Sequence, residues 1–206
     1  MSSMDRGDVV DKNALRGGTP KSMGDINNYI HPSFIHGKNF KIGRFNVIQK
    51  GCQVGDNIKI EHFVLFKKNT KIGNNVYVDS YFRSSGNNKI GNNVTLRFGS
   101  TIAREVTVKD DAFISPNVMT IYSTASHEKI GGTVIGKGAF IGTNAVIGPG
   151  IKIGPGVVIG SMAYVNRDCL EPGVYVGIPA RKIKDIPNRE GHPSWVKDLW
   201  ENRLGL

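Results

Sequence analysis

The sequence predicts an all-β fold, a parallel β-helix built from six-residue repeats. Three observations predict it: an aliphatic residue recurs at every sixth position, a smaller residue often follows four places later, and the stretches "VGDNI", "IGNNV" and "IGNNV" lie eighteen residues apart. A six-residue unit is too short for a helix and its connection, but it fits a short strand with a tight turn. Three such rungs therefore close one triangular coil, and successive coils stack at about 4.8 Å.

A first array of inward positions runs from Ile42 to Ile114, with Ser84 as its polar member. Glycines follow several of the aliphatic residues, and we expect them at sharp corners where a side chain would crowd or φ would be positive. Asparagines two places after these glycines would stack as a ladder of turn residues. The glycines are Gly55, Gly73 and Gly91, and the asparagines are Asn57, Asn75 and Asn93.

A second array continues the repeat from Ile135 to Val165, but its phase has moved by three residues. We interpret residues 126–130, "SHEKI", as one more rung of the first array, stacked after "VKDDA" at Val108, with three extra residues at 131–133. His127 would then stand at the corner position that glycine holds in earlier coils. The stretch 126–134 is therefore a candidate active site.

Three segments follow from these patterns: a polar N-terminal arm over residues 1–25, the β-helix domain over 26–183, and a C-terminal tail over 184–206. In the tail, Trp195, Leu199 and Trp200 lie on one helical stripe, which predicts a short amphipathic α-helix over about 193–204. Such a helix could cap the β-helix or cross onto a neighbouring subunit, since an open coil end exposes a sheet edge.

The formal net charge of +10 suits an anionic partner, such as nucleic acid, an acidic membrane face or a phosphate-rich cofactor, and does not choose among them. Cys52 and Cys169 lack metal-ligand spacing, so we expect reduced thiols and no zinc site. The histidines show no convergent spacing for any other metal. Because no apolar run could serve as a signal peptide or span a membrane, we expect a soluble cytoplasmic protein.

The ladder, together with "GTVIGKGAFIGTNAVIGPGIKIGPGVVIGSMAYVNRDCLEPGVYVGIPARKI", resembles the hexapeptide-repeat acyltransferases. It is most similar to the branch of galactoside, maltose and streptogramin acetyltransferases and polysaccharide O-acetyltransferases. The resemblance implies a left-handed parallel β-helix, an exception to the right-handed crossover rule. It also implies a homotrimer with active sites between subunits, acetyl-CoA as acyl donor, and neither nucleic acid nor stable membrane insertion.

Carried over by this resemblance, His127 is the general base, since an imidazole can take up a proton near neutral pH. Glu128 either orients the imidazole or faces water. The backbone N–H of Thr143 would stabilise the oxyanion. The implied cofactor-binding residues are Thr143, Ser161, Asn166, Arg167 and Arg181.

Acceptor recognition has weaker candidates, because the interruption at 131–133 is too short to be the long acceptor-binding loop of many relatives. Tyr81 and Arg83 cluster beside the polar slot Ser84, and Arg97 lies one coil further on. The alternative is that they are surface residues of an imperfect rung.

The leading hypothesis is acetyl-CoA-dependent transfer of an acetyl group to a hydroxyl of a sugar or surface-polysaccharide precursor. One alternative is N-acetylation of a nucleotide-linked amino sugar, and another is a noncatalytic β-helix subunit. The sequence leaves open the acceptor, the choice between O- and N-acetylation, and the length of the acyl chain.

Overall fold

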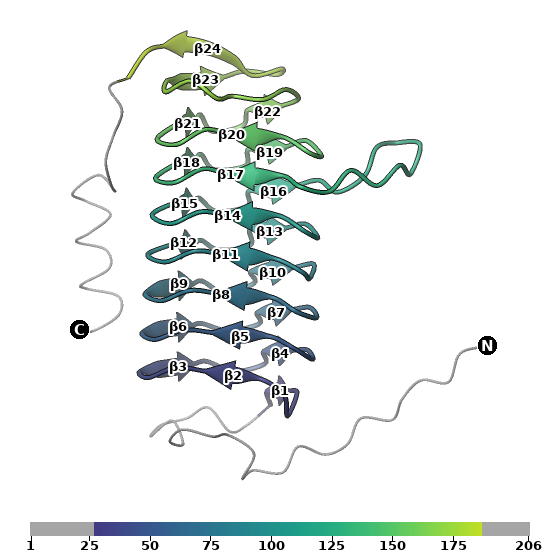
Figure 1. Cartoon of the computed structure of the whole chain (residues 1–206), viewed down its shortest axis with the longest axis vertical. Helices are drawn as coiled ribbons and strands as arrows, with labels where there is room; N and C mark the ends of the chain where they lie inside the picture. Colours follow the sequence, from purple (N-terminus) through teal and green to yellow (C-terminus); the bar gives the residue numbers. More distant parts are fainter. Residues whose placement is uncertain (1–26, 187–206) are drawn as a thin grey trace.

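The chain folds as a parallel β-solenoid of about eight coils in a computed structural model that describes residues 27–186 (Figure 1). Each coil but the last gives one strand to each of three sheets, so the molecule is a three-sided prism, and the described residues contain no helix. The predicted all-β fold is confirmed. The predicted N-terminal arm over 1–25 and the predicted helix over 193–204 lie outside the described residues.

We name the sheets A, B and C in the order in which the chain visits them. Sheet A contains Tyr29–Ile30 (β1), Val47–Ile48 (β4), Leu65–Phe66 (β7), Arg83–Ser84 (β10), Thr101–Ile102 (β13), Met119–Thr120 (β16), Val146–Ile147 (β19) and Tyr164–Val165 (β22). Sheet B contains Ile35–His36 (β2), Gln53–Val54 (β5), Lys71–Ile72 (β8), Lys89–Ile90 (β11), Thr107–Val108 (β14), Val134–Ile135 (β17) and Lys152–Ile153 (β20). Sheet C contains Phe40–Ile42 (β3), Ile58–Ile60 (β6), Val76–Val78 (β9), Thr95–Leu96 (β12), Phe113–Ile114 (β15), Phe140–Ile141 (β18), Val158–Ile159 (β21), Val174–Val176 (β23) and Arg181–Lys184 (β24).

The eighteen-residue coil is confirmed by the strand register. Val47 pairs with Leu65 in sheet A, and Lys71 pairs with Lys89 in sheet B. The C-terminal end of the described part departs from this pattern, because β24 returns antiparallel to β23. This last strand covers the outer edge of sheet C, which would otherwise present unpaired backbone groups.

The aliphatic slots form one continuous core along the axis. Ile48, Phe66 and Ile102 have no exposed surface, and the polar member Ser84 is also buried. The Ser84 hydroxyl donates to Asn88 Oδ1 at 2.6 Å, so its hydrogen-bonding need is met inside the coil. Phe82 fills the small slot beside it and is fully buried, which makes it a core residue.

The asparagine ladder is confirmed at the corner between sheets B and C. Asn57 Nδ2 donates to Asn75 Oδ1 at 2.8 Å, and Asn75 Nδ2 donates to Asn93 Oδ1 at 3.0 Å. These asparagines, with φ near +55°, occupy the left-handed conformation, which Asn adopts more readily than most residues. Gly55 serves close packing instead, since an added Cβ would lie 2.8 Å from the carbonyl oxygen of Gly73.

The phase break has a different structure from the predicted one. Thr107 of β14 pairs with Val134 of β17, 27 residues further on, so this coil has nine extra residues rather than three. Ser126 is exposed and fills no core slot, and the predicted rung "SHEKI" is wrong. The corner position of Gly55 and Gly91 is held here by Gly136, not by His127. The extra residues form a loop that projects from the solenoid between β16 and β17 (Figure 1).

Candidate active site

The projecting loop is a β-hairpin that carries His127 and Glu128 at its tip. Ser123 and Lys129 form an antiparallel bridge, and Thr124 N–H donates to the carbonyl of Glu128 at 2.9 Å. A tight turn closes the hairpin, because His127 N–H donates to the carbonyl of Thr124 at 3.0 Å. His127 itself has a φ of +63°, a conformation in which histidine is enriched among non-glycine residues.

The base of the hairpin packs against the coils below and above it. The Arg104 guanidinium lies 5.9 Å from the centroid of the Tyr122 ring, within cation–π range. On the other side, Gly150 N–H donates to Thr133 Oγ1 at 2.9 Å, and a Cβ at Gly150 would lie 2.6 Å from a methyl group of Ile130. The sequence reasoning missed these anchoring residues, although the polar Ser126 in an aliphatic slot was a signal that the repeat had been interrupted.

His127 and Glu128 are both exposed. Within the described residues, neither the imidazole nor the carboxylate makes a hydrogen bond, so the predicted orienting role of Glu128 remains a prediction. The backbone N–H of Glu128 donates to Thr124 Oγ1 at 3.2 Å, which fixes the turn. The hairpin therefore presents an accessible imidazole on a braced support.

Thr143 lies at the corner where sheet C passes to sheet A, which we call the CA corner. Its carbonyl accepts the N–H of Met162 at 2.9 Å, whereas its own N–H has no hydrogen-bond partner within residues 27–186. Thr143 is partly buried as a residue, and a backbone N–H without a partner can donate to an oxyanion. Ser161 is exposed at the same corner, one coil above Thr143.

The other predicted cofactor-binding residues lie elsewhere. Asn166 and Arg167 are exposed at the corner where sheet A passes to sheet B, which we call the AB corner, three coils beyond Arg104. The hairpin projects from this same AB corner. Arg181 is exposed on β24, at the capped end of the solenoid.

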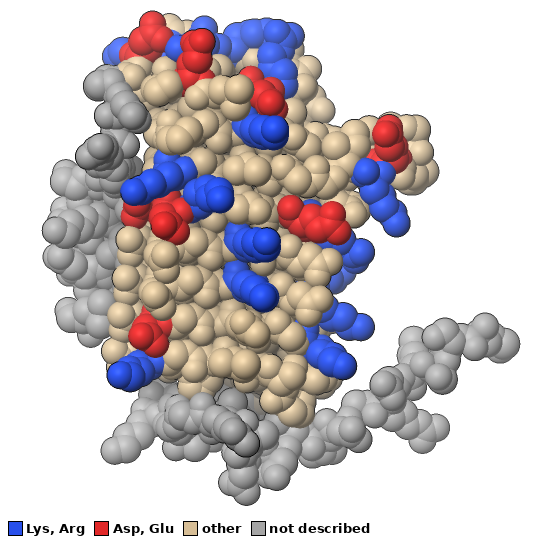
Figure 2. Space-filling view, viewed as in Figure 1, with Lys and Arg blue, Asp and Glu red and all other residues tan. Residues whose placement is uncertain are grey.

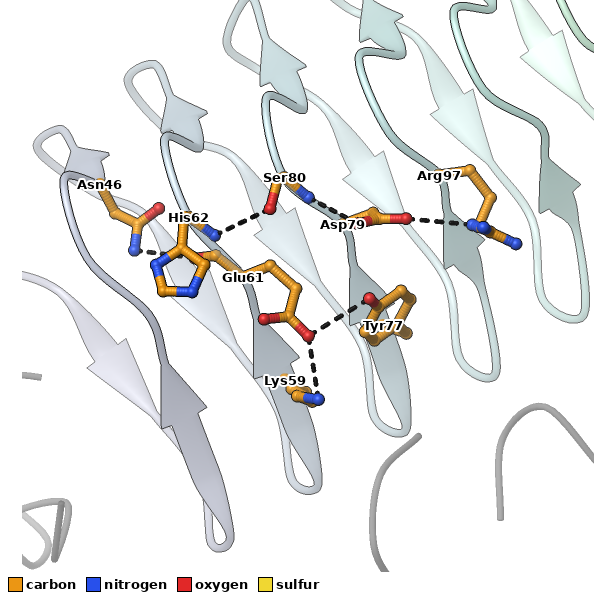
Figure 3. A network of polar contacts seen from close by, with 8 residues as sticks. All are labelled: Asn46, Lys59, Glu61, His62, Tyr77, Asp79, Ser80 and Arg97. Carbon is orange, nitrogen blue, oxygen red and sulfur yellow. Dashed lines mark hydrogen bonds and ion pairs between the residues drawn. The ribbon is translucent and has the colours of Figure 1, made fainter. Parts of the chain in front are cut away.

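The three acceptor candidates do not form one cluster. Arg97 Nε binds Asp79 Oδ2 at 3.1 Å, and Figure 3 shows this pair at one end of a network of polar contacts between neighbouring coils. Both side chains are largely buried, at 22% and 16% exposure, so Arg97 is held by the fold. Arg83 is exposed on the outer face of sheet A.

Tyr81 belongs to a stack of aromatic rings along the CA corner. Phe45, Phe63 and Tyr81 stack face to face with centroids 5.0 Å apart, and Phe98 meets Tyr81 edge-on at 5.3 Å. We call these four residues the aromatic ladder. Each ring is exposed over 45–47% of its surface. Phe45, Phe63 and Tyr81 also have φ near +60°, which is costly for bulky side chains.

The outer face of sheet A is also largely apolar and adjoins the aromatic ladder. Among its outward side chains Arg83 is the charged one within the described strands. The outward row in register is Tyr29, Val47, Leu65, Arg83, Thr101, Met119, Val146 and Tyr164. Extended apolar surface on a soluble fold marks an interaction surface.

Apart from Arg181 at the capped end, the predicted catalytic and cofactor-binding residues thus fall into two groups at the two corners that flank sheet A. His127, Glu128, Asn166 and Arg167 lie on the AB corner side, and Thr143 and Ser161 lie on the CA corner side. A single chain does not bring them together.

Residues 27–186 contain no group of three His, Cys, Asp or Glu side chains placed to hold a metal ion. No helix in that range is long and apolar enough to cross a membrane. Both cysteines are free and buried, and burial raises the pKa of the Cys52 and Cys169 thiols.

The comparison with known protein families concerns the later coils of the solenoid. Residues 132–167, from the end of the hairpin to β22, match the model of the bacterial transferase hexapeptide, six repeats. The chain therefore carries hexapeptide repeats of this kind over residues 132–167. No curated protein matches this hexapeptide-repeat protein as a relative.

Solved structures match it at low identity. UDP-N-acetylglucosamine O-acyltransferase of Moraxella catarrhalis is 19% identical over 80% of this chain and 73% of its own, with a TM-score of 0.57. UDP-N-acetylglucosamine acyltransferase of Campylobacter jejuni is 16% identical over 86% and 82%, with a TM-score of 0.58. These two structures share the β-solenoid fold.

A mutant of perosamine N-acetyltransferase from Caulobacter crescentus, crystallised with CoA and GDP-perosamine, also matches at 19% identity and a TM-score of 0.43. The match covers 77% of the hexapeptide-repeat protein but only 57% of the length of that enzyme.

Proposed function

We propose that this hexapeptide-repeat protein transfers an acetyl group from acetyl-CoA to a hydroxyl group of a sugar or surface-polysaccharide precursor in the cytoplasm. The observation that carries the proposal is that the described residues offer both an exposed His127 on the hairpin and, at the other corner of sheet A, a Thr143 N–H without a hydrogen-bond partner. The two groups are a general base and an oxyanion donor, the minimum set for direct acyl transfer.

In this mechanism the His127 imidazole removes the proton of the acceptor hydroxyl as the oxygen attacks the thioester carbonyl. The Thr143 N–H donates to the carbonyl oxygen as negative charge develops on it. Because the acceptor attacks directly, no enzyme nucleophile is required. The imidazolium of His127 then returns its proton to the departing thiolate.

The residues present fit the acyl donor. Coenzyme A carries a pyrophosphate and a 3′-phosphate, and the exposed guanidinium groups of Arg167 and Arg181 can pair with phosphates. The small side chain of Ser161 leaves room beside Thr143 for the pantetheine arm. Acetyl-CoA supplies the activated acetyl group when it is bound.

The division of the site between two corners leads us to propose a homotrimer. If the apolar face of sheet A and the aromatic ladder turn toward a common axis, the AB corner of one copy meets the CA corner of the next. His127 of one subunit then faces Thr143 of its neighbour. Burial of half-exposed aromatic and aliphatic side chains would drive this association.

Mixed subunits test the proposal. We expect His127→Ala to lower turnover by about two to four orders of magnitude, the usual range for loss of a general base. Thr143→Pro removes the N–H, and Pro116 already occupies the equivalent corner position one coil below, so the backbone accommodates proline there. Thr143→Ala, which keeps the N–H, is the matched control and should stay active.

Each inactive variant is expressed and purified by itself, and in a separate preparation the two variants are co-expressed. Thiol release from acetyl-CoA is then measured for every preparation with a panel of sugars, nucleotide sugars and amino sugars. Shared sites predict that mixed trimers recover part of the activity, since one interface pairs intact His127 with intact Thr143. Inactive mixtures would place both groups of one site in the same chain. Which acceptor responds distinguishes O-acetylation from N-acetylation.

A further inference from the structure

Sheet B has an outer face unlike that of sheet A. Its outward row carries Lys71 on β8, Lys89 on β11 and Lys152 on β20, all exposed, and Figure 2 shows blue side chains gathered over β8 and β11. Lys71 and Lys89 are direct partners in the register, about 4.8 Å apart along the stack. Like charges in this position destabilise a sheet.

Nothing in the fold offsets this repulsion. Within residues 27–186, Lys71, Lys89 and Lys109 form no ion pair, whereas four other cations do. Lysines often protect edge strands from unwanted pairing. That explanation fails here, because β8 and β11 lie inside sheet B with a strand on each side.

A groove runs over sheet B beside these lysines. Its lining includes the glycines Gly136 and Gly154 and the lysines Lys89, Lys109 and Lys137. Asp110 is the carboxylate among the lining residues, and its Oδ1 already accepts the backbone N–H of Asn92 at 2.7 Å. The groove is therefore cationic.

We propose that this groove binds an extended anionic polysaccharide. Lys71 and Lys89, one strand spacing apart, can meet successive carboxylate or phosphate groups of a linear chain, and the glycines in the lining let the chain approach the backbone. Single-stranded nucleic acid is a poorer fit, because no aromatic side chain lines the groove for base stacking. An anionic membrane is also a poorer fit, because a recessed surface does not insert into a headgroup layer.

The groove also adjoins the hairpin. Val134, the first residue of β17 after the hairpin, lies in the groove lining. A polysaccharide in the groove would thus pass the base of the segment that presents His127. This link makes the bound chain the acceptor, and that step rests on the proposed function, whereas binding itself does not.

Binding is tested with the full chain and a size-defined oligogalacturonate, followed by isothermal titration calorimetry at low and at moderate salt. We expect saturable binding that weakens with salt, and a neutral dextran oligomer of similar size should not bind. The triple variant Lys71→Gln, Lys89→Gln and Lys109→Gln should bind about tenfold more weakly or worse.

The matched control is Lys50→Gln, Lys67→Gln and Lys68→Gln, which removes the same charge from the exposed AB corner. It should bind the oligogalacturonate nearly as well as the unaltered chain. Equal losses in the two triple variants, or tighter binding to single-stranded DNA or to vesicles of anionic lipid, would overturn the proposal. An unaltered rate of acetyl transfer to small sugars in the groove variant would leave the proposed function intact, so the two ideas fail separately.

Discussion

At the scale of single residues, the corners depend on side chains that tolerate a positive φ. In the first five coils the corner between sheets B and C places an asparagine or an aspartate in the left-handed region, from Asn39 to Asp111, and hydrogen bonds join these residues from one coil to the next. The conformation and the ladder bond are separate contributions of one residue. Substitution can separate them.

Asn75→Ala should lower the free energy of unfolding by about 1–2 kcal/mol, because alanine loses both ladder bonds and disfavours a φ of +54°. Asn75→Gly loses the same bonds but accepts the conformation, so it should be less destabilised than the alanine variant. Urea denaturation of the three proteins measures both effects. Equal destabilisation by Ala and Gly would mean that the backbone conformation contributes nothing.

The sequence predicted the ladder, but it did not decide why the corners need glycine. The reason could be a positive φ or the crowding of a side chain. Glycine spacing alone cannot distinguish a residue that must adopt a left-handed conformation from one that must lack a Cβ. The neighbouring coil decides it: the carbonyl of Gly73 lies where a Cβ of residue 55 would be, while Asn57 takes the positive φ.

At the scale of elements, the hairpin shows what periodicity can and cannot predict. The aliphatic slots were predicted on both sides of the break, up to Ile114 and from Ile135 to Val165, since the period fixes the inward positions. The length of the insertion was wrong because nine extra residues and three extra residues leave the same phase in a six-residue repeat. Strand pairing between Thr107 and Val134 separates these possibilities, and pairing is not visible in one sequence.

Deleting residues 122–130 should restore an eighteen-residue coil, with Thr133 four places and Ile135 six places after Thr120. Because β14 and β17 keep their pairing, we expect circular dichroism and the thermal midpoint to change little, while acetyl transfer is lost with His127. A shortened protein that still transfers acetyl groups would show that the hairpin is not catalytic. Aggregation of the shortened protein would instead show that the hairpin is part of the folding core.

At the scale of the whole molecule, sheets A and B divide the surface into an apolar side and a cationic side. The sequence predicted which residues are candidates for the site, but it did not predict that they lie at two corners on either side of sheet A. Residue spacing in the sequence does not show at which corner of a coil a residue lies. The proposed trimer would bring the two corners together. It makes the aromatic ladder a contact between copies.

Phe63→Asp places a carboxylate in this contact at a φ of +59°, which aspartate tolerates. We expect the variant to fold but to dissociate into single chains, with activity lost because the site is divided. Asn74→Asp adds the same charge at the exposed corner between sheets B and C and should remain associated. Sedimentation velocity measures both, and an associated Phe63→Asp protein would exclude the ladder from the interface.

The CA corner changes character along the axis of the solenoid. Over the first coils it carries Phe45, Phe63, Tyr81 and Phe98, and over the later coils it carries Asn117, Thr143, Asn144 and Ser161. One corner of a repetitive scaffold can therefore carry the proposed contact between copies and, further along the axis, the candidate active site. Because each coil is a separate layer, whole coils could be added to or removed from the aromatic ladder without displacing the residues of the candidate active site.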